Sequence, residues 1–309
     1  MASLKEIKGR SNSVGSTLKI TAARKLVASA KLRKAQTAMA NMLPYEQTLH
    51  SILADMLQDD DLLKALGSDP EQGRSLLAGE RLSAGQLPVK GDVSRVALVV
   101  FSSDSSLCGA FNANVIRHFN ETARNLFEHG YDYQDIDVYA IGRKAADAAK
   151  KAGFSVSCGW SGLADKPSYE LSASLASELV GRFSDDKVQQ VILIYNHFAS
   201  TARQVVTREN YLPVSMESAF GGPGTDEGTD YILEPDALSL ARELLPKVLC
   251  LKIYAVSLDA NAAEHAARTV AMQIATDNAT DLLNELRLQY NKQRQQAITS
   301  EILDLQSAR

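Results

Sequence analysis

Residues 4–42, LKEIKGRSNSVGSTLKITAARKLVASAKLRKAQTAMANM, decide the fold, because their apolar and small side chains recur every three or four positions. With Leu4 and Ile7 as heptad positions a and d, the seam consists of Leu4, Ser11, Leu18, Lys25, Leu32 and Met39 at a, and Ile7, Val14, Thr21, Ala28, Ala35 and Met42 at d. This seam is imperfect but sustained over several heptads. It predicts a long helix that packs against a partner along its length.

The ends of this first helix carry recognisable signals. Ser3 is the predicted N-cap, and Glu6 follows three residues later, as in a capping box. Pro44 is expected to bend the helix, after which the apolar spacing resumes through Leu57. The prediction is one N-terminal coiled-coil helix over residues 1–57, about 80 Å long. Because Met1 leads directly into this pattern, neither a secretory signal nor a cleavable leader is expected.

A second long helix is predicted at the other end, over residues 235–309. Pro235 would lie in its first turn, where proline is tolerated, and Pro246 would kink it early. Spacings of three and four connect its apolar positions, among them Val256, Ala260, Ala263, Ala267, Val270, Ile274, Leu282, Leu286, Tyr290, Ala297, Ile298, Ile302 and Leu305. Helices of this length can bury such stripes only against each other, which predicts an antiparallel coiled coil.

The middle of the chain alternates strand and helix patterns. Strands are predicted at Val96–Phe101, Ile136–Ile141, Val188–Tyr195 and, as an edge strand, Gln204–Leu212; helices are predicted at Asn112–Glu128, Lys144–Ala152 and Tyr169–Phe183. This alternation predicts a small α/β layered, Rossmann-like domain over 93–215 with a largely parallel sheet. Segments rich in glycine or acidic residues, 58–92 and 216–234, would connect it to the two helices.

Charge is distributed unevenly along the 309 residues. The first 36 residues carry nine basic side chains and one acidic one, a net charge of +8, whereas the whole chain carries −4. This asymmetry suggests that the N-terminal helix meets an acidic partner. No apolar run approaches the roughly 20 residues that a membrane-spanning helix needs.

Signatures of catalysis and metal binding are missing from the sequence. It contains no P-loop, no G-x-G-x-x-G after the first strand and no G-x-S-x-G, and its five histidines lack metal-ligand spacing. Cys108, Cys158 and Cys250 lie far apart, which argues against a disulfide framework or a zinc site. No catalytic residue, cofactor or metal is therefore expected.

Two stretches invite a functional interpretation. The turn Ser102–Asn112 (SSDSSLCGAFN) follows a strand and precedes a helix, so it could cradle an anion or present Cys108 as a nucleophile. The competing interpretation, which we prefer, is a capped turn whose Ser and Asp side chains satisfy backbone N–H groups. Glu264 and His265 could be a base and a ligand, but are more simply polar positions on the long helix.

Several segments in the same order resemble the gamma subunits of F-type ATP synthases. They are 2–10 (ASLKEIKGR), 17–22 (TLKITA), 25–36 (KLVASAKLRKAQ), 263–268 (AEHAAR), 275–279 (ATDNA), 290–295 (YNKQRQ) and 298–302 (ITSEI). The turn at Cys108 is similar to that family's Ser-Asp-Arg-Gly-Leu-Cys-Gly. The resemblance covers both ends of the chain and the order of its domains.

The resemblance implies a rotating central-stalk shaft, not an enzyme, with ATP synthesis on the β subunits of a ring of α and β subunits. Its partners would be those α and β subunits, an epsilon subunit and the ring of c subunits, through which the chain is peripheral to a membrane. By the same resemblance, Arg294 and Gln295 would meet an acidic loop of a β subunit. Arg268 and the basic positions Lys31, Arg33 and Lys34 would also contact partner subunits.

The sequence departs from the family in places. Ser105 and Ser106 replace the family's Arg-Gly, and Arg24 stands where Met is usual. The resemblance implies the cytoplasmic side of a bacterial plasma membrane, with an organellar inner or thylakoid membrane as the alternative. Two other functions stay open at this point: a small α/β enzyme with coiled-coil arms, and a nucleic-acid binder that uses the basic helix.

Overall fold

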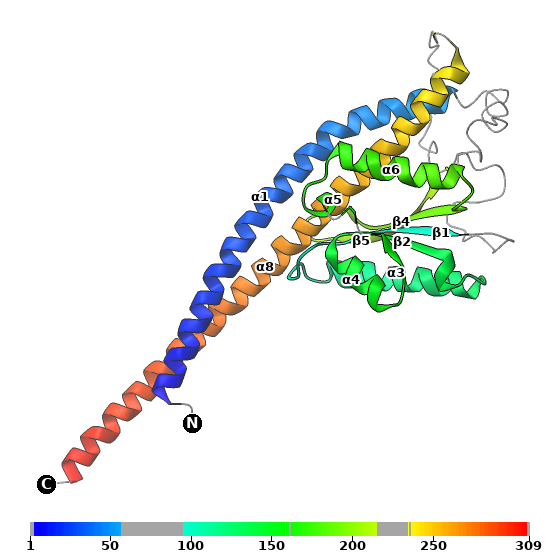
Figure 1. Cartoon of the computed structure of the whole chain (residues 1–309). Coiled ribbons are helices and arrows are strands. Elements are labelled where there is room, and N and C mark those ends of the chain that lie inside the picture. The colour runs from blue at the N-terminus through cyan, green and yellow to red at the C-terminus, as the bar shows by residue number, and fades with distance from the viewer. Residues whose placement is uncertain are drawn as a thin grey trace. The chain divides into compact units, whose positions relative to one another are not determined.

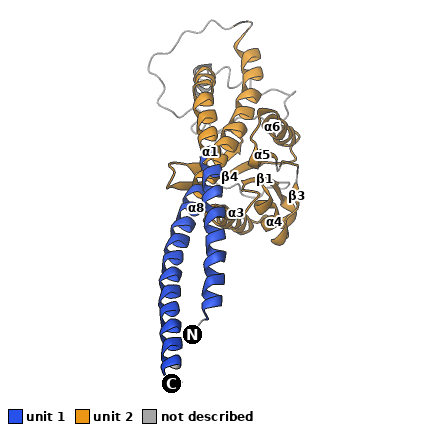
Figure 2. Cartoon of the chain, turned by 90° about the vertical axis from the view of Figure 1, so that its left-hand side faces the viewer, with its two compact units in different colours: residues 1–30, 268–309 blue, residues 31–267 orange. Residues whose placement is uncertain are grey.

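The computed structural model describes residues 3–56, 95–157, 159–160, 162–214, 234 and 236–307. The predicted connecting segment 58–92, nearly all of the predicted loop 216–234, and Cys158 lie outside these residues. The chain divides into two compact units, which are coloured separately in Figure 2. Unit 1 combines residues 1–30 with 268–309, and unit 2 comprises residues 31–267.

The N-terminal helix α1 spans Leu4–Met56 and continues through Pro44. The N–H of Glu6 donates to the Ser3 hydroxyl at 3.3 Å, so Ser3 is the N-cap, as predicted. Every predicted seam position, from Leu4 to Met42, is buried or half-buried. The heptad assignment therefore identified the face of α1 that packs.

The C-terminal helix α8 spans Ala237–Ser307 and continues through Pro246. It begins two residues later than predicted, and Asp236 caps it. The N–H of Ser239 donates to Asp236 Oδ1 at 2.8 Å, and the Ser239 hydroxyl donates to Oδ2 at 2.8 Å. These bonds satisfy groups that the first turn of a helix leaves without intrahelical partners. Pro235 lies outside the described residues.

Within each unit, α1 and α8 run antiparallel. In unit 1 the Thr276 hydroxyl donates to Thr21 Oγ1 at 3.0 Å, while Lys8 lies opposite Tyr290. In unit 2 Leu32 and Ala35 of α1 pack against Ala262 and Ala266 of α8. The predicted pairing of the two terminal helices is confirmed.

A mixed sheet of five strands forms the centre of unit 2. Its strands are β1 (Val96–Phe101), β2 (Ile136–Ile141), β3 (Val156–Ser157), β4 (Gln190–Phe198) and β5 (Gln204–Leu212), in the order β3-β2-β1-β4-β5. The first four strands of this order are parallel, and β5 is an antiparallel edge. Four strands were predicted, one of them as the edge. The two-residue β3 was missed because it is too short to show a pattern.

Helices cover both faces of the sheet (Figure 1). They are α3 (Phe111–Glu128), α4 (Arg143–Lys151), α5 (Gly162–Asp165) and α6 (Tyr169–Ser184), with a 3-10 turn η1 (Tyr133–Asp135). In β1, Val96, Leu98 and Val100 face α3 and α4, whereas the intervening residues face α6 and α8. Because both faces are covered, β1 is apolar throughout, as its sequence VALVVF predicted.

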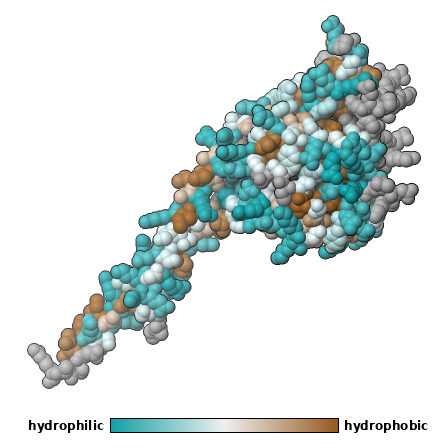
Figure 3. Space-filling model, in the orientation of Figure 1, coloured by the Kyte–Doolittle hydropathy of each residue, from teal (hydrophilic) through white to brown (hydrophobic). Residues whose placement is uncertain are grey.

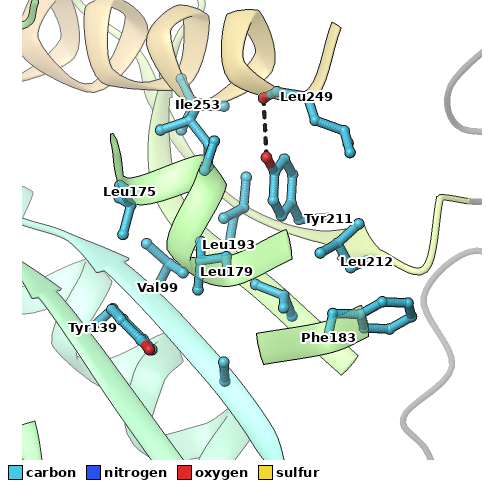
Figure 4. Close-up of a cluster of buried hydrophobic side chains, with 14 of the residues drawn as sticks. Val99, Tyr139, Leu175, Leu179, Phe183, Leu193, Tyr211, Leu212, Leu249 and Ile253 are labelled. Atoms are coloured by element: carbon cyan, nitrogen blue, oxygen red, sulfur yellow. Dashed lines mark hydrogen bonds between the residues drawn. The ribbon is translucent and has the colours of Figure 1, made fainter. Parts of the chain in front are cut away.

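The larger core joins the sheet to α6 and α8, as Figure 4 shows. Leu175, Leu179 and Phe183 extend from α6 toward the strands, and Ile253 of α8 packs on the same cluster. The buried Tyr211 hydroxyl donates to the carbonyl of Leu249 at 3.0 Å, which satisfies its polar end inside the core. α8 is thus both one helix of the coiled coil and part of the layer that covers one face of the sheet.

Gly142, between β2 and α4, is required by its surroundings. Its φ is +95°, and an added Cβ would lie 2.2 Å from the carbonyl oxygen of Ser102. Any side chain here would both strain the backbone and push β1 away from the start of α4.

We expect Gly142→Ala to lower the free energy of unfolding by about 2 kcal/mol or more, because conformational strain and steric overlap combine. Gly181→Ala is the matched control, since Gly181 lies inside α6 and nothing stands within 4 Å of its added Cβ. The control should gain roughly 0.5–1 kcal/mol. Urea unfolding followed by circular dichroism measures both, and equal stability of the two variants would contradict the packing described.

Candidate functional site

The turn Ser102–Asn112 occupies the place where an α/β domain could hold an anion, at the start of a helix. Here the chain's own groups satisfy the first amides of α4. The N–H of Arg143 donates to Asp104 Oδ1 at 2.9 Å, and the N–H of Ala145 donates to Ser102 Oγ at 2.8 Å. The amide between them donates to the Ser103 carbonyl at 3.2 Å. A phosphate would have to displace the Asp104 carboxylate from this position.

Cys108, in the same turn, is buried and lies within a network of neighbouring polar groups. The Asn112 amide donates to the Cys108 sulfur at 3.1 Å and to the Ser103 hydroxyl at 2.8 Å. No substrate can reach a sulfur atom that solvent does not reach. These contacts support the capped-turn interpretation over the cysteine nucleophile. The side chains of the turn cap α4, whereas α3, the helix that the turn precedes, has no side-chain cap at its N-terminus.

The buried tyrosines of the sheet are also unsuited to proton transfer. Burial raises the pKa of Tyr139 to about 12 and raises that of Tyr195 further above its ordinary value. Both hydroxyls would stay protonated near neutral pH. Within the described part of the chain, no group of three or more His, Cys, Asp or Glu side chains is placed to hold a metal ion.

The basic residues of α1 are mostly exposed, as a partner contact requires. Arg33 and Lys34 have exposed side chains. Lys31 is engaged within the chain: its Nζ lies 2.7 Å from Asp165 Oδ1 of α5. The hydrogen bond from Lys31 holds the pKa of Asp165 below its ordinary value. Of the three predicted contact residues on this helix, Lys31 therefore has an internal role that the sequence did not reveal.

The other predicted contact residues lie on the part of α8 that belongs to unit 1. Arg294 and Gln295 are exposed, and Arg268 is half-buried. α8 is one continuous helix over Ala237–Ser307, so the helix fixes the direction in which each of these three side chains points.

A groove of about 280 Å³ crosses the helix pair of unit 1. Its lining residues are Lys8, Ser11, Leu286, Arg287, Tyr290 and Asn291. Two cationic side chains stand beside a hydroxyl, a phenol and an amide, and only Leu286 is aliphatic. This combination suits a carboxylate or another anionic group of a partner.

Unit 1 also exposes many apolar side chains. Leu26, Leu288 and Leu305 have exposed fractions of 71%, 72% and 74%. The complete set is Ile20, Leu26, Val27, Ile274, Leu282, Leu288, Ile298, Ile302, Leu303 and Leu305. Figure 3 shows brown side chains interspersed with teal ones along these two helices. So many exposed apolar residues on one helix pair indicate a surface that a partner covers.

Glu264 and His265 are polar positions on the long helix, as expected, and both are buried. They belong to a stretch of α8, Val256–Ala267, in which every residue is buried. The sequence pattern did not identify Asp259 and Asn261, two further polar residues of this stretch, as buried residues. The signal that could have found them is the run of alanines around all faces of the helix, which indicates burial on every side.

None of the described helices contains an apolar window long enough for a bilayer crossing.

Comparisons with known proteins agree along the whole chain. The family model of ATP synthase matches residues 3–308. The ATP synthase gamma chains of Phocaeicola vulgatus and Bacteroides fragilis are 48% and 49% identical to it, over 99% of this chain and 98% of each relative. A solved chain in the central stalk and c-ring of the Tetrahymena thermophila mitochondrial ATP synthase shares the fold, with a TM-score of 0.56 and 19% identity over 83% of this chain and 99% of that one. The chain therefore belongs to the gamma chain family of ATP synthases.

Proposed function

We propose that this chain is the shaft of the central stalk of an F-type ATP synthase. It couples ion-driven rotation of the c-ring to conformational change in the catalytic β subunits. The observation that carries this proposal is the helix pair of unit 1, which exposes apolar side chains along α1 and α8. A surface of this kind on a gamma chain fits the interior of a surrounding ring of subunits.

In this proposal the chain itself does not catalyse ATP synthesis. The β subunits hold the nucleotide, and the shaft changes their relative stability by touching them differently at each angle. The closed turn at Asp104 agrees with a non-catalytic role, because the start of α4 is already satisfied.

Charge complementarity supports the partner contacts that we propose for α1. The exposed cations of α1, including Arg33 and Lys34, would face acidic surfaces of the α and β subunits. Arg294 and Gln295 would meet an acidic loop of one β subunit, and Arg268 would contribute a further contact. The α/β domain would face the epsilon subunit and the c-ring, which keeps the chain peripheral to the membrane. A bacterial plasma membrane, on its cytoplasmic side, is the proposed location.

Assembly tests the proposal directly. Co-expressed with its cognate α and β subunits, the chain should elute with them as one copy per three α/β pairs, and ATP hydrolysis should depend on its presence. Size exclusion and a hydrolysis assay measure both. Elution of the chain alone, with unchanged hydrolysis, would contradict the shaft assignment.

The contact assigned to Arg294 makes a second prediction. Arg294→Ala should leave the free energy of unfolding within about 0.5 kcal/mol of the parent, because the side chain is exposed. ATP synthesis by the assembled complex should fall. Lys292→Ala is the control, since this exposed cation lies two residues away and faces another direction. Equal synthesis rates in the two variants would remove Arg294 from the contact.

The groove of unit 1 gives a further prediction. Replacing Lys8 and Arg287 by Glu should slow association with the α/β ring and reverse its sensitivity to salt, because like charges would then meet. Arg10→Glu combined with Lys19→Glu, both on α1 and exposed but outside the groove lining, makes the same change in net charge and is the control. Association rates of the groove variant and of its control, each measured at low and high salt, test this prediction. An effect of the same size in the control would show that the groove has no special role.

A further inference from the structure

α8 is enclosed on every side between Val256 and Ala267, about three turns of helix. The segments that enclose it all lie within residues 31–267, which form unit 2. They are α1, the turn before α3, the short helix α5 and the end of β4, and we call them the collar (Figure 1). A helix buried on all faces is usual in the core of a large protein, but this one continues past Ala267 as part of the coiled coil.

The apolar contacts of the collar involve mainly alanines. Ala262 and Ala266 pack against α1, whereas Ala263 and Ala267 pack against Cys108 and Phe111. A single methyl group allows neighbouring elements to approach closely, but it forms only a low ridge on the helix surface. Such a surface interlocks weakly with its neighbours, so these contacts alone would resist rotation of α8 about its axis poorly.

Two polar side chains supply directional contacts. Asp259 accepts the N–H of Phe198 at 2.8 Å, and its second carboxylate oxygen lies 2.7 Å from His197 Nδ1. The amide of Asn261 donates to the carbonyl of Ala164 in α5 at 2.9 Å. Rotation of α8 within the collar would leave a buried carboxylate and a buried amide without partners, which is unfavourable.

α5, which accepts the bond from Asn261, is also bound to α1. Asp165, next to Ala164, pairs with Lys31 of α1 at 2.7 Å. A cavity of only about 10 Å³ is left where Asn261 and Glu264 meet the strand ends, at the lower limit for one water molecule. The collar thus holds α8 through bonds to β4 and α5, with little free space in which it could turn.

We propose that the collar locks α8 to the α/β domain. Asp259 and Asn261 are the positioning residues through which torque passes between that domain and the part of α8 that follows Ala267. This inference rests on the proposed shaft function and adds where in the chain the torque passes. It also gives Lys31 a role in supporting the lock.

The experiment compares two activities of the complete complex in membrane vesicles. ATP hydrolysis needs the shaft inside the α/β ring, whereas ATP-driven ion pumping also needs torque to reach the c-ring. Asp259→Ala combined with Asn261→Ala should retain hydrolysis and assembly while the ratio of pumping to hydrolysis falls severalfold. Asp259→Asn alone should keep most of the ratio, because its carbonyl oxygen can still accept the Phe198 N–H and its amide can still donate to His197 Nδ1.

Glu243→Gln is the matched control. It removes an ion pair of 2.6 Å to Lys247 that lies wholly on α8, so the ratio should not change. If the double variant fails to assemble, His197→Ala decides, because the His197 side chain is 51% exposed and its loss leaves the Phe198 bond in place. A lower ratio in that variant supports the lock.

An unchanged ratio in an assembled double variant, or in His197→Ala where that variant decides, overturns the lock. Failure of the parent chain to assemble with α and β, or to support pumping, would instead contradict the shaft function itself. The two failures are therefore distinguishable.

Discussion

The burial of α8 between Val256 and Ala267 constrains the rest of unit 2. α1, α5, the turn at Cys108 and the end of β4 must all reach one helix, and they can do so only because its surface there consists largely of alanine. A larger side chain at Ala262 or Ala263 would separate elements that the sheet fixes in place. The polar residues in the same stretch are tolerated because Asp259 and Asn261 find partners in β4 and α5.

The same helix has a different character beyond Ala267. In unit 1 its buried face narrows to positions such as Met272, Ala279 and Leu286, while Ile274 and Leu288 are exposed. Stability of the isolated chain must therefore come mostly from unit 2, where both faces of the sheet are covered. In the proposed assembly, unit 1 would gain further burial from the subunits around it. One uninterrupted helix thus serves as core in one unit and as a contact surface in the other.

Much of this architecture was predictable because it follows from local patterns. The heptad seam, the apolar run at Val96–Phe101 and the Ser3 cap each depend on residues close in sequence. The features that were missed depend on distant pairs. Lys31 and Asp165 are 134 positions apart. The serine and aspartate caps of the turn at 102–112 were expected, but not that Ser102 accepts the N–H of Ala145, 43 positions away. An exposed lysine that meets a partner and one that meets its own chain look alike in sequence, so the ion pair of Lys31 could not be predicted from its sequence context.

The contact surface of unit 1 mixes charge with dispersed apolar groups, and this combination has a consequence for a rotating part. In the proposed assembly, the exposed cations would orient the helices toward acidic surfaces and accelerate association. The apolar residues Ile20, Leu26 and Val27 of α1 are interspersed with the charged residues Lys19, Arg24 and Lys25. A large patch matched to a single partner position would hold the shaft at one angle. Dispersed contacts, each of modest strength, allow every angle to favour a different set of partner conformations, which is the condition for driving several sites in turn.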